Sequence, residues 1–190
     1  MKLRIITQPI VEPITLAEAK AHCRIDFIED DELISGLISA ARNYVEERTR
    51  RTLPLTTWEL ALDEVKGDIE IPRPPLVSIN SITFEDSSGV VVTIPTADYV
   101  VDDISEPAIV RHKKNWGKGW GFNNGAVINA IRVNFTAGYT LIPKTLKQAI
   151  LMLIAHYYEN REPTAEGRNS GQIPHAVDAL ISLSRVYRQV

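Results

Sequence analysis

The residues of this sequence that could act in metal or acid–base chemistry are few and widely spaced. Its four histidines are His22, His112, His156 and His175. His156 and Glu159 lie three residues apart on one expected helix, which is half of the pattern that holds a carboxylate-bridged metal pair. The sequence contains no second copy of this pattern. We therefore expect His156 to be a surface or helix-end histidine and predict no metal site.

The sequence also offers no activated nucleophile. Cys23 directly follows His22, and neighbouring side chains on a helix point in directions about 100° apart, so the two cannot readily form a nucleophile–base pair. Cys23 is expected to be a half-buried thiol. There is no phosphate-binding glycine loop, no dinucleotide-binding glycine motif and no G-x-S-x-G serine motif. We predict that the protein is not an enzyme and has no cofactor.

One segment, residues 112–125, combines cations with three aromatic residues and four glycines and has no acidic residue. Cations interleaved with aromatic rings can bind a nucleic-acid strand through charge and stacking. The same residues could instead form a protein-docking loop, or a long hairpin loop whose tryptophans fold back onto a sheet. These three interpretations stay open. The residues that would make the docking or nucleic-acid contacts are Lys113, Lys114, Trp116, Lys118 and Trp120.

The last expected helix carries more apolar positions than one packing face needs. Its first stripe, at helical spacing, consists of Ile173, Val177, Leu180, Ser184 and Tyr187. Its second stripe, offset by roughly 100°, consists of Ala176, Ala179, Leu183, Val186 and Val190. One stripe suffices to dock a terminal helix on its own core. Either the helix has a wide apolar face, or the second stripe contacts a partner; we adopt the second interpretation.

Composition indicates a soluble globular chain. The 190 residues are 44% hydrophobic and 24% charged, with a net charge of −3. This balance argues against a protein that coats nucleic acid. A single cysteine excludes an internal disulfide framework. The longest apolar run, residues 149–155, is far shorter than the ~18–20 residues of a membrane span, and no signal peptide is expected.

The elements that would position these residues suggest an α+β fold in three parts. Residues 1–52 are helical in pattern after an extended start, with a capping box at Thr15 and Glu18 and a second helix from about Asp30 to Arg51. Residues 53–142 are strand-like. Residues 143–190 are helical again, with helices at 144–160 and from Pro174 almost to Val190. The expected strands are 57–62, 68–71, 78–85, 90–94, 99–102, 108–112 and 127–136.

Several short segments, in this order, resemble the head–tail connector (adaptor or head-completion) proteins of long-tailed bacteriophages. None is specific alone, because each consists mostly of capping and packing residues, but their order and spacing together are characteristic. The segments are residues 13–20 (PITLAEAK), 30–42 (DDELISGLISAAR), 72–76 (PRPPL), 135–139 (FTAGY), 147–150 (KQAI) and 156–162 (HYYENRE).

This resemblance implies a small bundle of about four helices, formed by residues 1–52 and 143–190, with residues 53–142 as a β-rich insertion. It implies a structural virion protein without catalytic residues, made in the bacterial cytoplasm and located at the head–tail junction. Its partners would be further copies in a ring, of twelve subunits in this family, the portal protein, and the next joining or tail protein. DNA would pass through the channel without sequence-specific binding, and no membrane is implied.

By the same resemblance, the C-terminal helix around residues 173–190 would face the portal, which assigns the second stripe to portal contact. The 112–125 loop has no counterpart in the family pattern. It leaves an alternative function, a nucleic-acid-binding accessory protein of phage DNA packaging or regulation.

Overall fold

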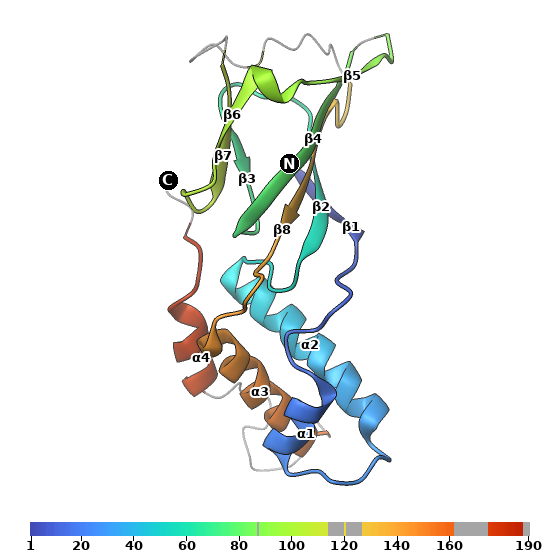
Figure 1. The fold of residues 1–190 in the computed structure, drawn as a ribbon, viewed down its shortest axis with the longest axis vertical. Helices are drawn as coiled ribbons and strands as arrows, with labels where there is room; N and C mark the ends of the chain where they lie inside the picture. The colour runs from blue at the N-terminus through green and yellow to red at the C-terminus, as the bar shows by residue number, and fades with distance from the viewer. Residues whose placement is uncertain (87, 114–119, 121–126, 162–174, 188–190) are drawn as a thin grey trace. The chain divides into compact units, whose positions relative to one another are not determined.

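The computed structural model describes residues 1–86, 88–113, 120, 127–161 and 175–187 (Figure 1). The fold is α+β, as predicted, and its sheets are antiparallel. Among the described residues, two compact units are present. The β unit comprises residues 1–9 and 55–139, and the helical unit comprises residues 10–54 and 140–187.

The β unit contains two antiparallel sheets. The larger has the strand order β1-β2-β8-β4-β5 and the smaller β3-β7-β6. A short 3-10 helix, η1 (Thr96–Asp98), precedes β6. The strands are β1 (Lys2–Thr7), β2 (Thr56–Leu62), β3 (Ile69–Ile71), β4 (Leu76–Glu85), β5 (Val91–Thr93), β6 (Tyr99–Asp102), β7 (Ala108–His112) and β8 (Ile131–Ala137).

The core of the β unit follows from the alternation of side chains along each strand. In β8, Ile131, Val133 and Phe135 are fully buried, while Arg132 is exposed. The buried face of the larger sheet joins one hydrophobic cluster with residues of the smaller sheet, such as Val110. The other face of the larger sheet carries polar side chains.

Strand β1 was not predicted, because the sequence pattern placed residues 1–52 in the helical part. Residues 2–7 instead pair with β2, with Leu3 opposite Leu60 and Arg4 opposite Glu59. This pairing joins residues fifty or more positions apart along the chain. Such a contact leaves only a short local signal, the alternation Lys2-Leu3-Arg4-Ile5.

The helical unit contains α1 (Leu16–Cys23), α2 (Asp31–Thr49), α3 (Lys144–Glu159) and α4 (His175–Ser182). The predicted capping box at the start of α1 is present. The Thr15 hydroxyl accepts from the Glu18 N–H (3.2 Å), and the Glu18 carboxylate accepts from the Thr15 N–H (2.8 Å). Helix α2 contacts α1, α3 and α4, so it organises this unit.

Helix α3 contains the longest apolar run of the sequence, residues 149–155. One face is buried, through Leu146, Ala149, Ile150, Leu153 and Ile154. Leu151 and Met152, on the other side, are only half-buried. The apolar surplus seen in the sequence therefore remains partly accessible in the single chain.

A buried ionic cluster holds α2 to the chain on both sides of it. Arg42 Nε contacts Glu12 Oε2 at 2.7 Å, and Arg42 Nη1 contacts Glu46 Oε2 at 3.2 Å. The other Glu46 oxygen accepts from the Leu53 N–H at 2.7 Å. Arg42 and Glu46 are each only 8% exposed. Because every charge in the cluster has a partner, the desolvation cost of burial is offset.

A second polar contact joins the start of α2 to the end of α3. The Asp30 carboxylate accepts from the Tyr158 hydroxyl at 2.6 Å and from the Arg161 guanidinium. These two contacts, the tyrosine hydrogen bond above all, lower the pKa of Asp30. A carboxyl with a lowered pKa stabilises the fold when it is ionised.

We predict that Arg42→Met lowers the free energy of unfolding by about 2–3 kcal/mol, because it removes the buried cation that Glu12 and Glu46 share. Arg48→Met, at an exposed position on the same helix, should cost clearly less, because exposed ion contacts are screened by solvent. Urea denaturation of both variants measures the difference. Equal stability of the two variants would contradict the role given to the cluster.

Asp30→Asn should destabilise the protein at pH 7 and lose its effect in acid. The folded-state pKa of Asp30 lies below its unfolded value of about 3.9. The stabilisation is therefore present above that unfolded value and disappears as the pH falls through the folded value. The difference in unfolding midpoint between the wild type and Asp30→Asn should be constant near pH 7 and should shrink as the pH falls below about 4. Asp26→Asn, at an exposed position, is the control, and a gap that stays constant with pH would contradict the assignment.

Candidate assembly surfaces

Helix α4 ends at Ser182, so the prediction that it runs almost to residue 190 is wrong. The backbone after it bonds to the end of α2 instead. The Val186 N–H donates to the Thr49 carbonyl at 2.9 Å, and Arg51 Nε donates to the Ser184 carbonyl at 2.6 Å. Carbonyls in the last turn of a helix have no partner within the helix. The segment after α4 satisfies one of them, Thr49, and thereby leaves the helical path.

Some residues of the second stripe are exposed, and others are not. Ala176 and Ala179 are exposed on α4, and Leu183 is 78% exposed just after it. Val186 is buried against the helical unit, at 8% exposure. Val190 lies outside the described residues. The part of the second stripe that is free to meet a partner is therefore Ala176, Ala179 and Leu183.

Only part of the first stripe lies on the face of α4 that is buried in the helical unit. Val177 is fully buried, and so is Ile181, which neither stripe included. Tyr187 is 67% exposed, and Ile173 lies outside the described residues. The sequence pattern overestimated the helix length, so the helical spacing it assumed does not hold for Val186 and Tyr187.

Of the five residues named for docking or nucleic-acid contact, the structure describes two, Lys113 and Trp120. Lys113 is exposed, whereas Trp120 is only 3% exposed and belongs to the core cluster of the β unit. The Trp120 indole N–H donates to the Gly67 carbonyl at 2.9 Å, and its ring meets His112 edge-on at 5.2 Å. Trp120 therefore folds back onto the sheets, as one of the three interpretations held. Lys114, Trp116 and Lys118 lie outside the described residues.

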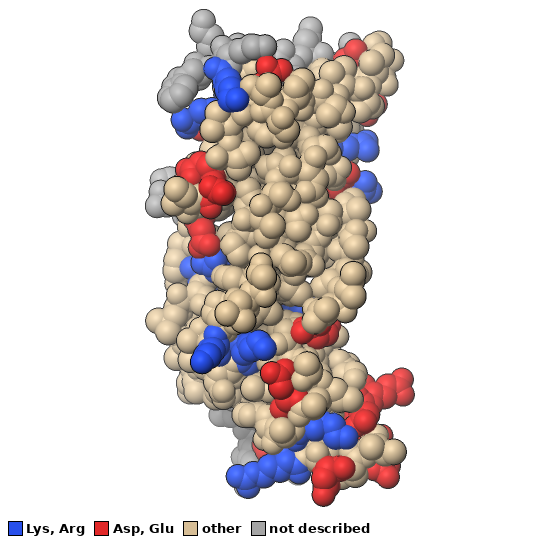
Figure 2. All heavy atoms as spheres, viewed as in Figure 1, with Lys and Arg blue, Asp and Glu red and all other residues tan. Residues whose placement is uncertain are grey.

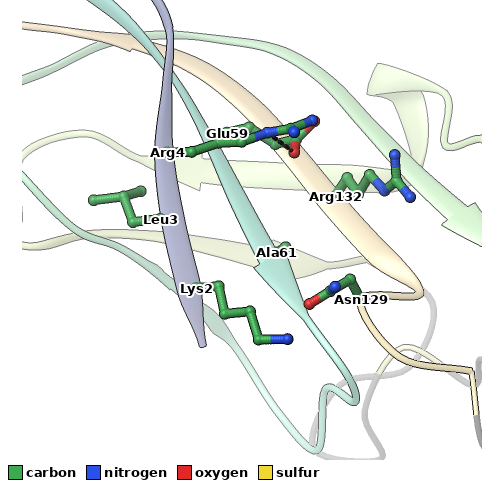
Figure 3. A pocket seen from close by; sticks show the side chains of 7 residues that line it. All are labelled: Lys2, Leu3, Arg4, Glu59, Ala61, Asn129 and Arg132. Carbon is green, nitrogen blue, oxygen red and sulfur yellow. Dashed lines mark ion pairs between the residues drawn. The ribbon is translucent and has the colours of Figure 1, made fainter.

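A cation-lined hollow on the polar face of the larger sheet was missed by sequence reasoning. Lys2 and Arg4 of β1 extend across β2 toward Arg132 of β8, with Asn129 at the rim (Figure 3). Arg4 Nε contacts Glu59 Oε1 at 2.7 Å, and Glu59 is 8% exposed. The register explains the grouping, because it places Lys2, Ala61 and Arg132 in one row across three strands. Only recognition of β1 could have revealed it.

Charge on the surface is dispersed. In the view of Figure 2, Lys and Arg side chains form small separate groups, often beside acidic ones, with broad uncharged areas between them. A protein that tracks a nucleic-acid backbone usually concentrates cations in a continuous groove. The described surface in this view does not show such a groove.

The remaining candidates for chemistry lie apart from one another. Cys23 is half-buried, as predicted, and burial, followed by the nearby Glu159 carboxylate, raises the pKa of its thiol. His22 and His175 are exposed, and His156 Nδ1 lies 3.3 Å from the Asn160 side-chain nitrogen. Within the described ranges, no three His, Cys, Asp or Glu residues are grouped so that they could hold a metal ion.

In the part of the chain that the structure describes, no helix has the length and apolarity needed to span a membrane.

Comparison with known families supports the resemblance seen in the sequence. Residues 13–89 match the model of the family described as "Phage gp6-like head-tail connector protein". The match runs from the start of α1 through β4, so it includes parts of both units. The resemblance to head–tail connector proteins is thereby confirmed. No curated protein matches the sequence significantly.

Solved structures with a similar fold come from gene transfer agent (GTA) particles. A chain of the "Neck of empty GTA particle computed with C6 symmetry" aligns with a TM-score of 0.76 and 24% identity. A chain of the "Neck of native GTA particle computed with C12 symmetry" gives 0.74 and 24%. Each alignment covers 100% of this chain and 98% of the other. The fold is therefore shared over the whole chain, including both units.

The buried position of Trp120 leads to a stability prediction. Trp120→Ala should lower the free energy of unfolding by roughly 3–5 kcal/mol, because it empties part of the core. Trp120→Phe should cost about 1–3 kcal/mol, because it leaves the Gly67 carbonyl without its donor. Val100→Ala, at a position 52% exposed on β6, is the control and should cost less than about 1 kcal/mol. Chemical denaturation followed by fluorescence measures all three, and a stable Trp120→Ala would contradict the core assignment.

Proposed function

We propose that the protein is a structural virion component that forms a ring-shaped adaptor between the portal of a capsid and the tail. The observation that carries the proposal is the connector-family match over residues 13–89. It is supported by a fold shared along the whole chain with neck chains of gene transfer agent particles. In this role the protein makes and breaks no covalent bond, so it is not an enzyme.

The ring would contain twelve copies. One of the similar neck structures was computed with C12 symmetry and another with C6. A ring of this kind needs two different surfaces on each subunit that meet by rotation. DNA would pass through its channel, and a net charge of −3 suits a channel that must release phosphates. The portal protein and the next joining or tail protein would bind on opposite sides, at the head–tail junction of the virion.

We propose that the connector core is the bundle of four helices within residues 1–52 and 143–190, apart from strand β1, and that residues 53–142 are a β-rich insertion in it. The neck chains similar in fold have the β unit as well, since the alignments span nearly their full lengths. The insertion would distinguish this group from shorter connectors. Synthesis would take place in the cytoplasm of the bacterial host.

Portal contact is assigned to the exposed part of the second stripe, Ala176, Ala179 and Leu183. Leu183 is the largest of the three and is 78% exposed. Val186 supports this surface from within, because its backbone N–H bonds to Thr49 and its side chain is buried. An acidic residue at position 186 would therefore disturb folding rather than test docking alone.

The test is electron microscopy and co-sedimentation of the purified chain with the portal protein of the same particle. The wild type should cap portal rings with a second ring. Leu183→Asp should reduce binding at least tenfold without changing the unfolding midpoint, because it places a charge in an apolar contact. Leu141→Asp, at an exposed leucine of the helical unit (84% exposed), is the matched control and should bind normally. Failure of the wild type to bind any portal would overturn the adaptor role, and normal binding of Leu183→Asp would overturn the assigned contact.

A filter-binding assay at low salt addresses the nucleic-acid alternative. An adaptor should show weak binding of DNA that does not change when Lys113, Lys114 and Lys118 are replaced by alanine. Tight binding lost in that triple variant would favour the accessory DNA-binding role instead. Trp120 is buried and already hydrogen-bonded, so it is a poor base-stacking platform, which weighs against this alternative.

A further inference from the structure

The larger sheet of the β unit has two open edges. The strand order begins with β1 and ends with β5, and no described strand pairs with the outer side of either. Both edges are apolar at the surface. On β1, Ile5 and Ile6 are 37% and 49% exposed, and beside and on β5, Val90, Val91 and Val92 are 47–60% exposed. Proteins usually protect such edges, because unpaired strands recruit other chains.

The hydrogen bonds around β5 show which backbone groups face outward. The Asp86 N–H donates to the Val90 carbonyl, and the Ile94 N–H donates to the Ile82 carbonyl. Bonding alternates along an antiparallel pair, so Val92 bonds to β4 together with Val90 and Ile94. The backbone groups of Val91 and Thr93 consequently point away from β4. They present donors and acceptors to an incoming strand.

The two edges carry opposite charges. On β1, Lys2 is exposed, and Arg4 has 64% of its side chain exposed although it contacts Glu59. Beside β5, the end of β4 and the hairpin loop carry Glu85 and Asp86, and hydrogen bonds from Ser88 lower the pKa of Asp86. Two β1 edges would bring cations together, and two β5 edges would bring carboxylates together. Only β1 against β5 joins unlike charges.

We propose that β1 of one copy pairs with β5 of the next copy, so that the larger sheets of neighbouring subunits form one continuous sheet around the ring. This inference rests on the proposed function, because it names the contact that closes the ring. Rotational symmetry above two-fold requires a head-to-tail contact between two different surfaces. The two opposite, oppositely charged edges of one sheet meet this requirement, and main-chain pairing between edges is a common mode of protein association.

Crosslinking in the assembled full-length chain tests the pairing. In a Cys23→Ser background, one preparation carries Ile5→Cys and another carries Val92→Cys. A short bis-maleimide should give crosslinked dimers when the two are mixed and essentially none in either preparation alone. The chain that carries both cysteines should give a ladder of oligomers. Homodimers of the Ile5→Cys chain, or no crosslink in any sample, would overturn the inference.

A proline variant separates backbone pairing from mere proximity. Val91→Pro removes an outward N–H and keeps the bonds to β4, which an edge strand tolerates. It should lower the mixed crosslink yield roughly three- to tenfold, whereas Val91→Thr, which keeps the donor, should not. Equal yields from the two variants, at equal unfolding midpoints, would overturn the strand pairing.

The same samples are viewed by electron microscopy, so that the two proposals can fail separately. Rings on the portal without β1–β5 crosslinks would overturn this inference and leave the adaptor role standing. Crosslinked ladders without binding to the portal would support the strand pairing and overturn the adaptor role.

Discussion

The β unit depends on the burial of one face of β8. This strand lies at the centre of the larger sheet, with β2 on one side and β4 on the other. Val133 and Phe135 are fully buried, and they stand opposite Leu60 and Trp58 of β2. A one-residue slip in this register would turn the apolar face outward and bring Arg132 and Asn134 into the core. The register of β8 therefore determines both the core and the polar face.

The placement of charge follows from the same register. Because Arg132 points away from the core, it shares a face with Lys2 and Arg4 of β1, and it lies 3.8 Å from the carboxylate of Glu85, which ends β4 opposite Val91 of β5. The sheet thus runs from a basic edge to an acidic one. Nothing in overall composition shows this, since a net charge of −3 averages over both edges.

Local sequence patterns predicted the features that depend on contacts between residues close in sequence. The capping box at Thr15 and Glu18, the period of α2 and the alternation of β8 could all be read from the sequence. Contacts distant in sequence could not. Strand β1 exists because it pairs with β2, and α4 ends early because Val186 bonds to Thr49. For Trp120 the sequence left three interpretations open, because its partner Gly67 lies far away along the chain.

The structure changes which residues of this chain can form an assembly surface. The sequence patterns identified apolar side chains that could contact a partner. Two of them, Val186 and Trp120, are buried in the folded chain. An open strand edge leaves a weaker mark in sequence, because its donors and acceptors belong to the backbone of any residue. A ring subunit must keep such groups unpaired until its neighbour arrives, and opposite charges at the two edges disfavour contacts between like edges. Assembly through edges would therefore be specific, although each edge alone is short.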